Sequence, residues 1–224
     1  MFNAAEIKKM NNQSMGEEIA NSISHGIGAL LAIAGTVVAI VYACLHGDAR
    51  SIVSASLYGA GLIILYLAST LYHSITNLKA KRVFRILDHC SIYILILSSY
   101  IPISLSLMRG ADGWILFGIN TFCTALGVTL TAINMKKFHA LAMVLYLLMG
   151  WSIVFFGFPT IMTLPSAAIW LLVLGGLCYT GGIAFFAMKK PKYMHSIWHL
   201  FVLAGSVLHY FAFLFYALPF PPKF

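Results

Sequence analysis

The chain has 224 residues, of which 61% are hydrophobic and only 9% are charged. A soluble domain carries roughly 25% charged residues because its surface faces water, so this composition excludes a soluble enzyme or a disordered chain and predicts an integral membrane protein. The net charge of +8 does not indicate a nucleic-acid-binding protein, because the basic residues lie in short segments between apolar runs and form no stripe with interleaved aromatic residues.

Seven apolar runs are each long enough to cross a bilayer as a helix, which takes about 20 residues. In chain order these runs cover residues 19–45, 52–75, 83–107, 114–135, 140–158, 166–188 and 197–218. Pro102 lies inside the third run and is expected to kink that helix. The sequence therefore predicts an all-α integral membrane protein with one seven-helix transmembrane domain at 19–218, a short N-terminal segment at 1–18 and a short tail at 219–224.

The distribution of basic residues predicts how the helices are oriented. Eleven of the 14 Lys and Arg residues fall on one side of the membrane when the seven runs are threaded through it, and the other three are Arg50, Arg109 and Lys223. The eleven are Lys8 and Lys9 in the N-terminal segment, Lys79, Lys81, Arg82 and Arg85 at the second connection, Lys136 and Lys137 at the fourth, and Lys189, Lys190 and Lys192 at the sixth. Because basic residues accumulate in cytoplasmic loops, we expect a cytoplasmic N-terminus and an external C-terminus. This orientation argues against a G-protein-coupled receptor. A retinal protein is excluded because the last run has no lysine for a Schiff base.

Polar side chains gather near the cytoplasmic ends of four of the predicted helices. Ionisable groups are costly inside a membrane and mark functional sites. Glu18 stands where the first run begins, and Asp88 is the one carboxylate clearly inside a run. With the expected orientation, the residues that share this depth are Asn21, His25, Ser69, His73, Asp88, His195 and His199.

Three of these residues suggest a metal site. His195 and His199 are four residues apart and therefore share one face of a helix, and His73 brings a third imidazole to the same depth. Three imidazoles with one open position form a catalytic zinc arrangement, in which Asp88 can orient a water molecule or accept its proton. Ser69 is one turn from His73 and can hydrogen-bond a carbonyl oxygen. The substrate expected on this hypothesis is an acyl lipid that enters from the cytoplasmic leaflet.

A purely structural interpretation stays open for each part of this pattern. The three histidines and Asp88 can form a hydrogen-bonded cluster that holds helices together without a metal. Glu18, Asn21 and His25 can simply fasten the first helix to the bundle. His209 is ten residues beyond His199, about 15 Å along a helix, so it cannot share a metal with that residue.

Four segments carry a resemblance to a known family: EEIANSISHGIGALLAIAG, LASTLYHS, RILDHCSIYILI and HSIWHLFVLAGSVLHY. With them the chain resembles the bacterial haemolysin III family from about Glu17 to Tyr216. That family is a branch of the progestin and adipoQ receptor superfamily, which is related to alkaline ceramidases. Its members are seven-helix proteins of the membrane with a cytoplasmic N-terminus, so the resemblance implies a multi-pass protein of the bacterial cytoplasmic (inner) membrane.

The resemblance also implies a role for each residue of the site. It assigns the zinc ligands to His73, His195 and His199, the residue that holds the zinc-bound water to Asp88, and the serine beside the site to Ser69. Glu18, Asn21 and His25 match the first-helix motif of the family. The long N-terminal extension of the eukaryotic receptors is missing, so we expect no peptide hormone as a partner.

Two functions are therefore in competition. The first is a zinc-dependent hydrolase that cleaves an amide or ester bond of a membrane lipid and so adjusts membrane composition or fluidity. The second is a non-catalytic regulator or sensor of the membrane's fluidity or energetics, in which zinc only joins helices. A transporter ranks lower, because the outer halves of the runs contain few polar groups besides Ser98, Ser99 and His209. A cytolysin also ranks low, because seven apolar spans leave no soluble state.

Overall fold

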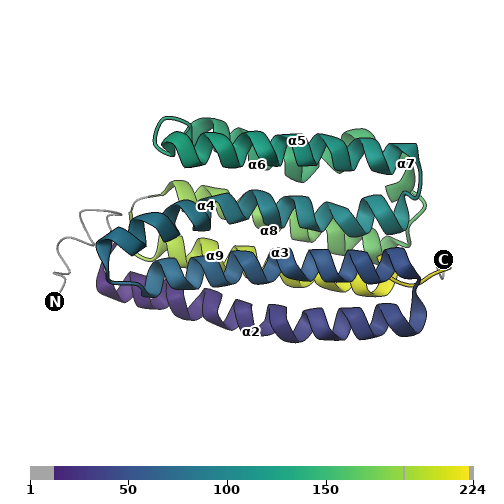
Figure 1. The fold of residues 1–224 in the computed structure, drawn as a ribbon, viewed down its shortest axis with the longest axis horizontal. Coiled ribbons are helices and arrows are strands. Elements are labelled where there is room, and N and C mark those ends of the chain that lie inside the picture. The colour runs from purple at the N-terminus through teal and green to yellow at the C-terminus, as the bar shows by residue number, and fades with distance from the viewer. Residues whose placement is uncertain (1–12, 189, 222–224) are drawn as a thin grey trace.

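The structure is a computed structural model that describes residues 13–188 and 190–221, and within these residues it contains helices and no strands (Figure 1). The elements are α2 (Met15–His46), α3 (Ala49–Ser74), α4 (Leu78–Ile101), η1 (Pro102–Leu107), α5 (Ala111–Asn134), α6 (His139–Phe156), α7 (Phe158–Ile161), α8 (Ser166–Ala187), α9 (Met194–Ala212) and η2 (Phe213–Ala217). Seven helices in the described part of the chain are long and apolar enough to span a membrane, with η1 continuing α4 and η2 continuing α9. The predicted fold class is confirmed.

The helices run lengthwise along the molecule, with the two termini at opposite ends (Figure 1). The beginnings of α2, α4 and α9 and the end of α3 lie together at the end where the N-terminus is drawn. Helix α3 packs against both α2 and α4, and α9 packs against α2 and α8. The four predicted polar segments therefore meet at one end of the bundle.

Side-chain caps explain why three of these helices begin in polar sequence. At the start of α2, the Ser14 hydroxyl accepts from the Glu17 amide and the Glu17 carboxylate accepts from the Ser14 amide, a reciprocal capping box. Asp48 caps α3 through the Ser51 amide, and Asn77 caps α4 through the amides of the second and third residues after it. Each cap satisfies backbone N–H groups that have no partner inside the helix.

At Pro102 the third span continues as a π-helix instead of ending. Proline has no N–H, and its ring crowds the preceding turn. The wider turn is visible where the Met108 amide donates to the Ile103 carbonyl, five residues back, at 2.8 Å. The structure thus accommodates the proline, for which the sequence predicted a kink, by adding a residue to the turn.

Two boundaries differ from the predicted runs in a way that matters for the site. Helix α2 begins at Met15, so Glu17 and Glu18 belong to its first turn and are buried. Helix α4 begins at Leu78, so the basic residues assigned to the second connection (Lys79, Lys81, Arg82 and Arg85) lie on the first two turns of a helix, and Asp88 is ten residues inside it. Four of the basic residues that predict the orientation, Lys8, Lys9, Lys189 and Lys223, lie outside the described residues.

Candidate metal centre

Three histidines from two helices converge at the end of the bundle where α2, α4 and α9 begin. His73 lies in the last turn of α3, and His195 and His199 lie on the first turns of α9. Each offers a ring nitrogen, and these nitrogens lie within 4.8 Å of one another. His199 is completely buried and His73 is 4% exposed. The predicted set of three imidazoles is brought together.

The hydrogen bonds around the rings leave one nitrogen of each histidine available. The Nε2 atoms of His73, His195 and His199 are buried, and none has a hydrogen-bond partner in the described part of the chain. A buried polar atom without a partner is costly, so it calls for a ligand. Imidazole nitrogens are ordinary zinc ligands, and the three available here lie within 4.8 Å of one another. These donor atoms therefore fit a zinc ion.

Helix α2 contacts the other ring nitrogen of two of the histidines. The Glu18 carboxylate lies 2.8 Å from His73 Nδ1. His199 Nδ1 lies 3.2 Å from the Asn21 carbonyl oxygen and 3.1 Å from the Ser24 hydroxyl. The Asn21 side chain also accepts a hydrogen bond from Ser196 on α9. The first helix thus touches the site directly.

His25 has a different environment from the three candidate ligands. Its ring stacks on the ring of His199 with centroids 3.5 Å apart and meets Tyr66 edge-on. It is 1% exposed, and neither of its ring nitrogens has a hydrogen-bond partner among residues 13–188 and 190–221. His25 therefore belongs to the wall of the site.

Among the described residues, neither Asp88 nor Ser69 hydrogen-bonds to the three histidines. Asp88 is 4% exposed, and its carboxylate approaches His89 Nδ1 at 3.7 Å. Ser69 is one turn before His73 on α3 and is fully buried, and its hydroxyl has no hydrogen-bond partner among the described residues. Both side chains remain available to a water molecule or a substrate.

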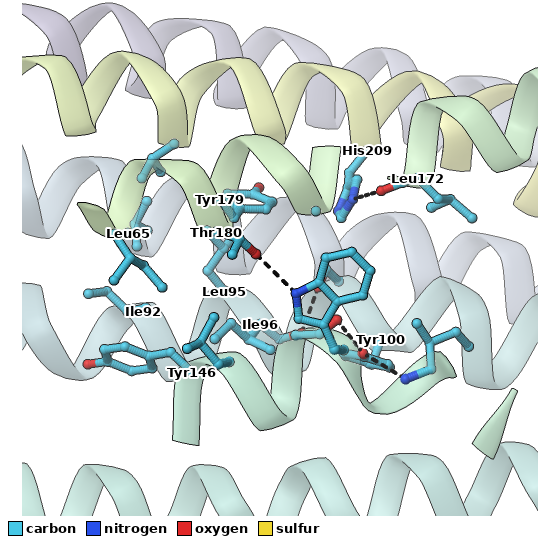
Figure 2. Close-up of a pocket in the computed structure, with 18 of the residues that line it drawn as sticks. Leu65, Ile92, Leu95, Ile96, Tyr100, Tyr146, Leu172, Tyr179, Thr180 and His209 are labelled. Carbon is cyan, nitrogen blue, oxygen red and sulfur yellow. Dashed lines mark hydrogen bonds between the residues drawn. The ribbon is translucent and has the colours of Figure 1, made fainter. Parts of the chain in front are cut away.

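A cavity of about 170 Å³ lies between α4, α6, α8 and α9. The three candidate ligands do not line it themselves, but its wall includes His25 and Trp198, whose rings contact the ring of His199. His25, Asp88, Phe186 and Trp198 line it at the histidine end, and the Phe186 and Trp198 rings also contact the ring of His195. Farther from this end, the cavity wall is mainly apolar. Figure 2 shows this part, with Leu65 and Tyr146 toward one side and His209 toward the other.

The polar groups of the cavity away from the histidines are mostly bonded within the protein. His209 Nε2 lies 3.0 Å from the Leu172 carbonyl oxygen, and the Trp151 indole donates to Thr180 at 3.0 Å (Figure 2). The Tyr100 hydroxyl donates to the Gly150 carbonyl at 2.9 Å. The cavity therefore offers an apolar lining with a polar end.

One charged residue of the site is not predicted from the sequence. Lys81 is 1% exposed, and its ammonium group is 3.0 Å from the Glu18 carboxylate. The apolar runs place it in the connection between the second and third spans. The available signal was the spacing of Lys81, Arg85 and Asp88, which puts the three on one face of a helix.

Comparisons with known proteins agree over almost the whole length. A family model described as haemolysin-III related matches residues 13–210. Hemolysin-3 of Bacillus cereus is 41% identical over 207 residues, which cover 92% of this chain and 94% of that protein. The Hemolysin-3 homolog of Bacillus subtilis (strain 168) is 41% identical over 205 residues, covering 92% and 96%. The human monocyte to macrophage differentiation factor is 27% identical over 209 residues, covering 88% and 82%.

Proposed function

The chain belongs to the haemolysin III family, and on that premise we propose that it is a zinc-dependent hydrolase that cleaves an amide or ester bond of a membrane lipid. One observation carries the proposal: three buried imidazole nitrogens have no partner among the described residues, and they lie behind His25 and Trp198, which line an apolar cavity together with Asp88. Two relatives of nearly equal length come from Bacillus species, which supports the cytoplasmic membrane of a bacterium as its location.

Each residue has a distinct task in this reaction. His73, His195 and His199 hold the ion, and zinc when bound supplies a Lewis acid and makes water acidic enough to yield hydroxide near neutral pH. Asp88 accepts the proton of the attacking water and returns it to the amine or alcohol that leaves. Ser69 donates a hydrogen bond from its hydroxyl to the carbonyl oxygen, where negative charge develops.

The cavity supports a lipid as the substrate. From Asp88 to Ile103, both in its wall, the chain advances about 22 Å along the third span, so the space follows the direction of an acyl chain in the bilayer. Its mostly apolar wall would hold the chain while the scissile bond stays beside Asp88. Cleavage would release a fatty acid and change the lipid composition of the membrane.

The test is a hydrolysis assay on the purified, zinc-loaded protein in vesicles that contain acyl-labelled ceramide and acyl-labelled phospholipid. Wild type should release labelled fatty acid, and Asp88→Asn should keep its zinc but lose about 10²–10⁴-fold in rate, the usual contribution of a general acid–base group. Asp112→Asn is the matched control, because Asp112 is an exposed carboxylate in the first turn of α5. The absence of labelled fatty acid with zinc-loaded wild type would overturn the proposal.

The regulator hypothesis makes a different prediction for the same variants. His73 and His199 come from separate helices, so a metal that only joins α3 to α9 would need the histidines but not Asp88. Metal content by mass spectrometry should show about one zinc per chain in wild type and none in His199→Ala. If Asp88→Asn then retains full activity in cells, the regulator replaces the hydrolase.

A further inference from the structure

Glu18 is a buried carboxylate whose partners come from two other helices. It is 2% exposed, and one oxygen, Oε2, accepts from His73 Nδ1 at 2.8 Å and from Lys81 Nζ at 3.0 Å. The neighbouring Glu17 points elsewhere, to the amides of Ser14 and Tyr193. The two adjacent carboxylates of α2 therefore have separate roles, one at a helix cap and one at the candidate metal centre.

Lys81 is fixed in place by a full set of acceptors. Besides Glu18, its ammonium group donates to the Tyr72 carbonyl at 2.7 Å and to the His73 carbonyl at 3.4 Å. An ammonium group has three donor hydrogens, and all three are engaged. Lys81 therefore cannot bind a substrate, and its charge balances Glu18.

A buried ion pair of this kind is weak evidence for stability. Removing two charges from water costs about as much as their attraction returns, and apolar replacements are often neutral or stabilising. A charged pair inside a membrane protein is therefore expected where it serves a function. Here the carboxylate is in direct contact with a candidate metal ligand.

The hydrogen bonds around His73 determine which of its ring nitrogens carries the proton. A carboxylate paired with an ammonium group is ionised and can only accept, so His73 Nδ1 must be the donor. Asn21 Nδ2 approaches the same nitrogen only to 3.5 Å and is itself a donor. With the proton on Nδ1, the lone pair of Nε2 is free to bind a metal.

The same reasoning applies to His199. The Ser24 hydroxyl donates its hydrogen to the Asn21 carbonyl at 2.9 Å, so both oxygens near His199 Nδ1 present lone pairs to it. That nitrogen must also carry its proton, which again leaves Nε2 unprotonated. Two of the three imidazoles are thus oriented by α2, which supplies no ligand of its own.

We infer that α2 is the positioning element of the metal centre, and that Glu18, balanced by Lys81, fixes the tautomer and orientation of His73. This inference rests on the metal site of the proposed function, but not on the reaction. Carboxylates that hold a metal-binding histidine in this way typically contribute 10–100-fold to metal affinity. Glu18 is a positioning residue, because it reaches the ion only through His73.

The experiment separates positioning from simple charge balance. Glu18→Leu alone leaves Lys81 buried without its counter-ion, so it is compared as the double variant Glu18→Leu/Lys81→Met, which removes both charges. Glu18→Gln/Lys81→Met keeps an acceptor oxygen near His73 and preserves the side-chain volumes. Glu17→Gln is the control, since it makes the same chemical change one residue away.

Zinc affinity is measured by competition with a chromophoric chelator, and the visible spectrum of the cobalt-loaded protein reports the geometry of the ligands. Glu18→Leu/Lys81→Met should fold, bind zinc about 10–100-fold more weakly and show an altered cobalt spectrum. Glu18→Gln/Lys81→Met should fall between it and wild type, and Glu17→Gln should match wild type. Unchanged affinity and spectrum in both double variants would overturn the inference and reduce Glu18 to a packing role.

A measurement without metal distinguishes a failure of this inference from a failure of the proposed function. In ¹⁵N spectra of histidine-labelled, metal-free protein, the signal missing from His73→Gln identifies His73. It should show the Nδ1–H tautomer in wild type and a mixture in Glu18→Gln/Lys81→Met. A wild-type ring protonated at Nε2 would overturn the inference. Wild type with no zinc but with the Nδ1–H tautomer would instead overturn the hydrolase and leave the positioning by Glu18 standing.

Discussion

His25 is a buried side chain whose ring nitrogens have no hydrogen-bond partner in the described part of the chain. Its ring is stacked on His199 and both its nitrogens lack a partner among those residues. A buried polar atom left unsatisfied costs about 1–3 kcal/mol. A residue of this kind persists when a bound molecule uses the polar atoms, and His25 lines the cavity beside Asp88.

Replacing His25 by phenylalanine tests this directly. Phenylalanine keeps an aromatic ring against His199 and removes the two nitrogens, so the thermal midpoint of the purified protein in detergent should stay the same or rise. Zinc content should not change, because His25 is not one of the three candidate ligands. Turnover of the lipid should fall if the nitrogens serve the substrate.

His209→Phe provides the comparison for His25→Phe. The His209 Nε2–H group donates to the Leu172 carbonyl oxygen at 3.0 Å, so losing this ring nitrogen should lower stability by about 0.5–1.5 kcal/mol, the net value of a hydrogen bond. If His25→Phe lowers the midpoint as much as His209→Phe does, His25 has a bonding partner in the resting protein.

The sequence could predict the three histidines but not the groups that hold them. Counting depth along each apolar run put His73, His195 and His199 at one level, and the structure confirms that they meet. The contact between Glu18 and His73 joins residues 55 positions apart, and no local pattern reports such a contact. Hydropathy places Lys81 in a loop, because it treats every lysine as solvent-exposed. The buried Glu18 carboxylate instead stabilises the Lys81 ammonium group inside the protein.

At the scale of elements, the apolar runs predicted each of the seven spans. They did not predict the polar first turns with which α2 and α4 begin. Helices α2 and α4 begin before their runs do, because Ser14 and Asn77 cap turns made of charged residues. Hydropathy detects the part of a helix that lies in hydrocarbon, and capping determines where the hydrogen-bonded turns begin. Those extra turns contain Glu18 and Lys81, so the missed boundaries and the missed ion pair have one cause.

The contact between α8 and α9 depends on glycines of α8. A Cβ atom added to Gly175 would overlap the ring of His209, and one added to Gly182 would lie 3.0 Å from Phe201 Cβ. Small residues let membrane helices approach closely and gain van der Waals contacts. These contacts matter because the hydrophobic effect does not drive helices together inside lipid. This contact also fixes one wall of the cavity.

Gly175→Ala should therefore destabilise the protein by about 1–3 kcal/mol, the range for overpacking a well-packed interior. Gly118→Ala is the matched control, because an added Cβ there has no atom within 4 Å, and alanine favours a helix by up to about 1 kcal/mol. Thermal unfolding of both variants in the same detergent gives the comparison. Equal midpoints for the two variants would show that α8 and α9 are not in close contact at Gly175.

At the scale of the whole molecule, the outer surface matches a bilayer. Large apolar side chains that are more than two-thirds exposed occur on the outward faces of α2, α5 and α6, among them Leu30, Leu45, Phe122, Ile133 and Phe155. In water such a surface would cause aggregation. In hydrocarbon such a surface is stable without a protein partner. The buried polar side chains at the histidine end, among them Glu18, Lys81 and Asp88, lie inside the bundle.

The direction in which the bundle crosses the membrane remains a prediction. Among the described residues, and without the buried Lys81, seven basic residues lie at the histidine end of the bundle and two, Arg50 and Arg109, lie at the other end. Positive charge is retained in the cytoplasm, so the histidines should face the cytoplasmic leaflet.

Fusions to the C-terminus in a bacterium with two membranes test this orientation. Alkaline phosphatase is active only outside the cytoplasm, so a C-terminal alkaline phosphatase fusion should be active. Green fluorescent protein fused to the C-terminus would be exported and should not fluoresce. The N-terminal fusions should behave in the opposite way, which controls for expression. A fluorescent C-terminal fusion would show that the orientation is the reverse of the predicted one. Any lipid that reaches Asp88 from the histidine end would then come from the outer leaflet. The orientation of the helices therefore decides which leaflet supplies the substrate.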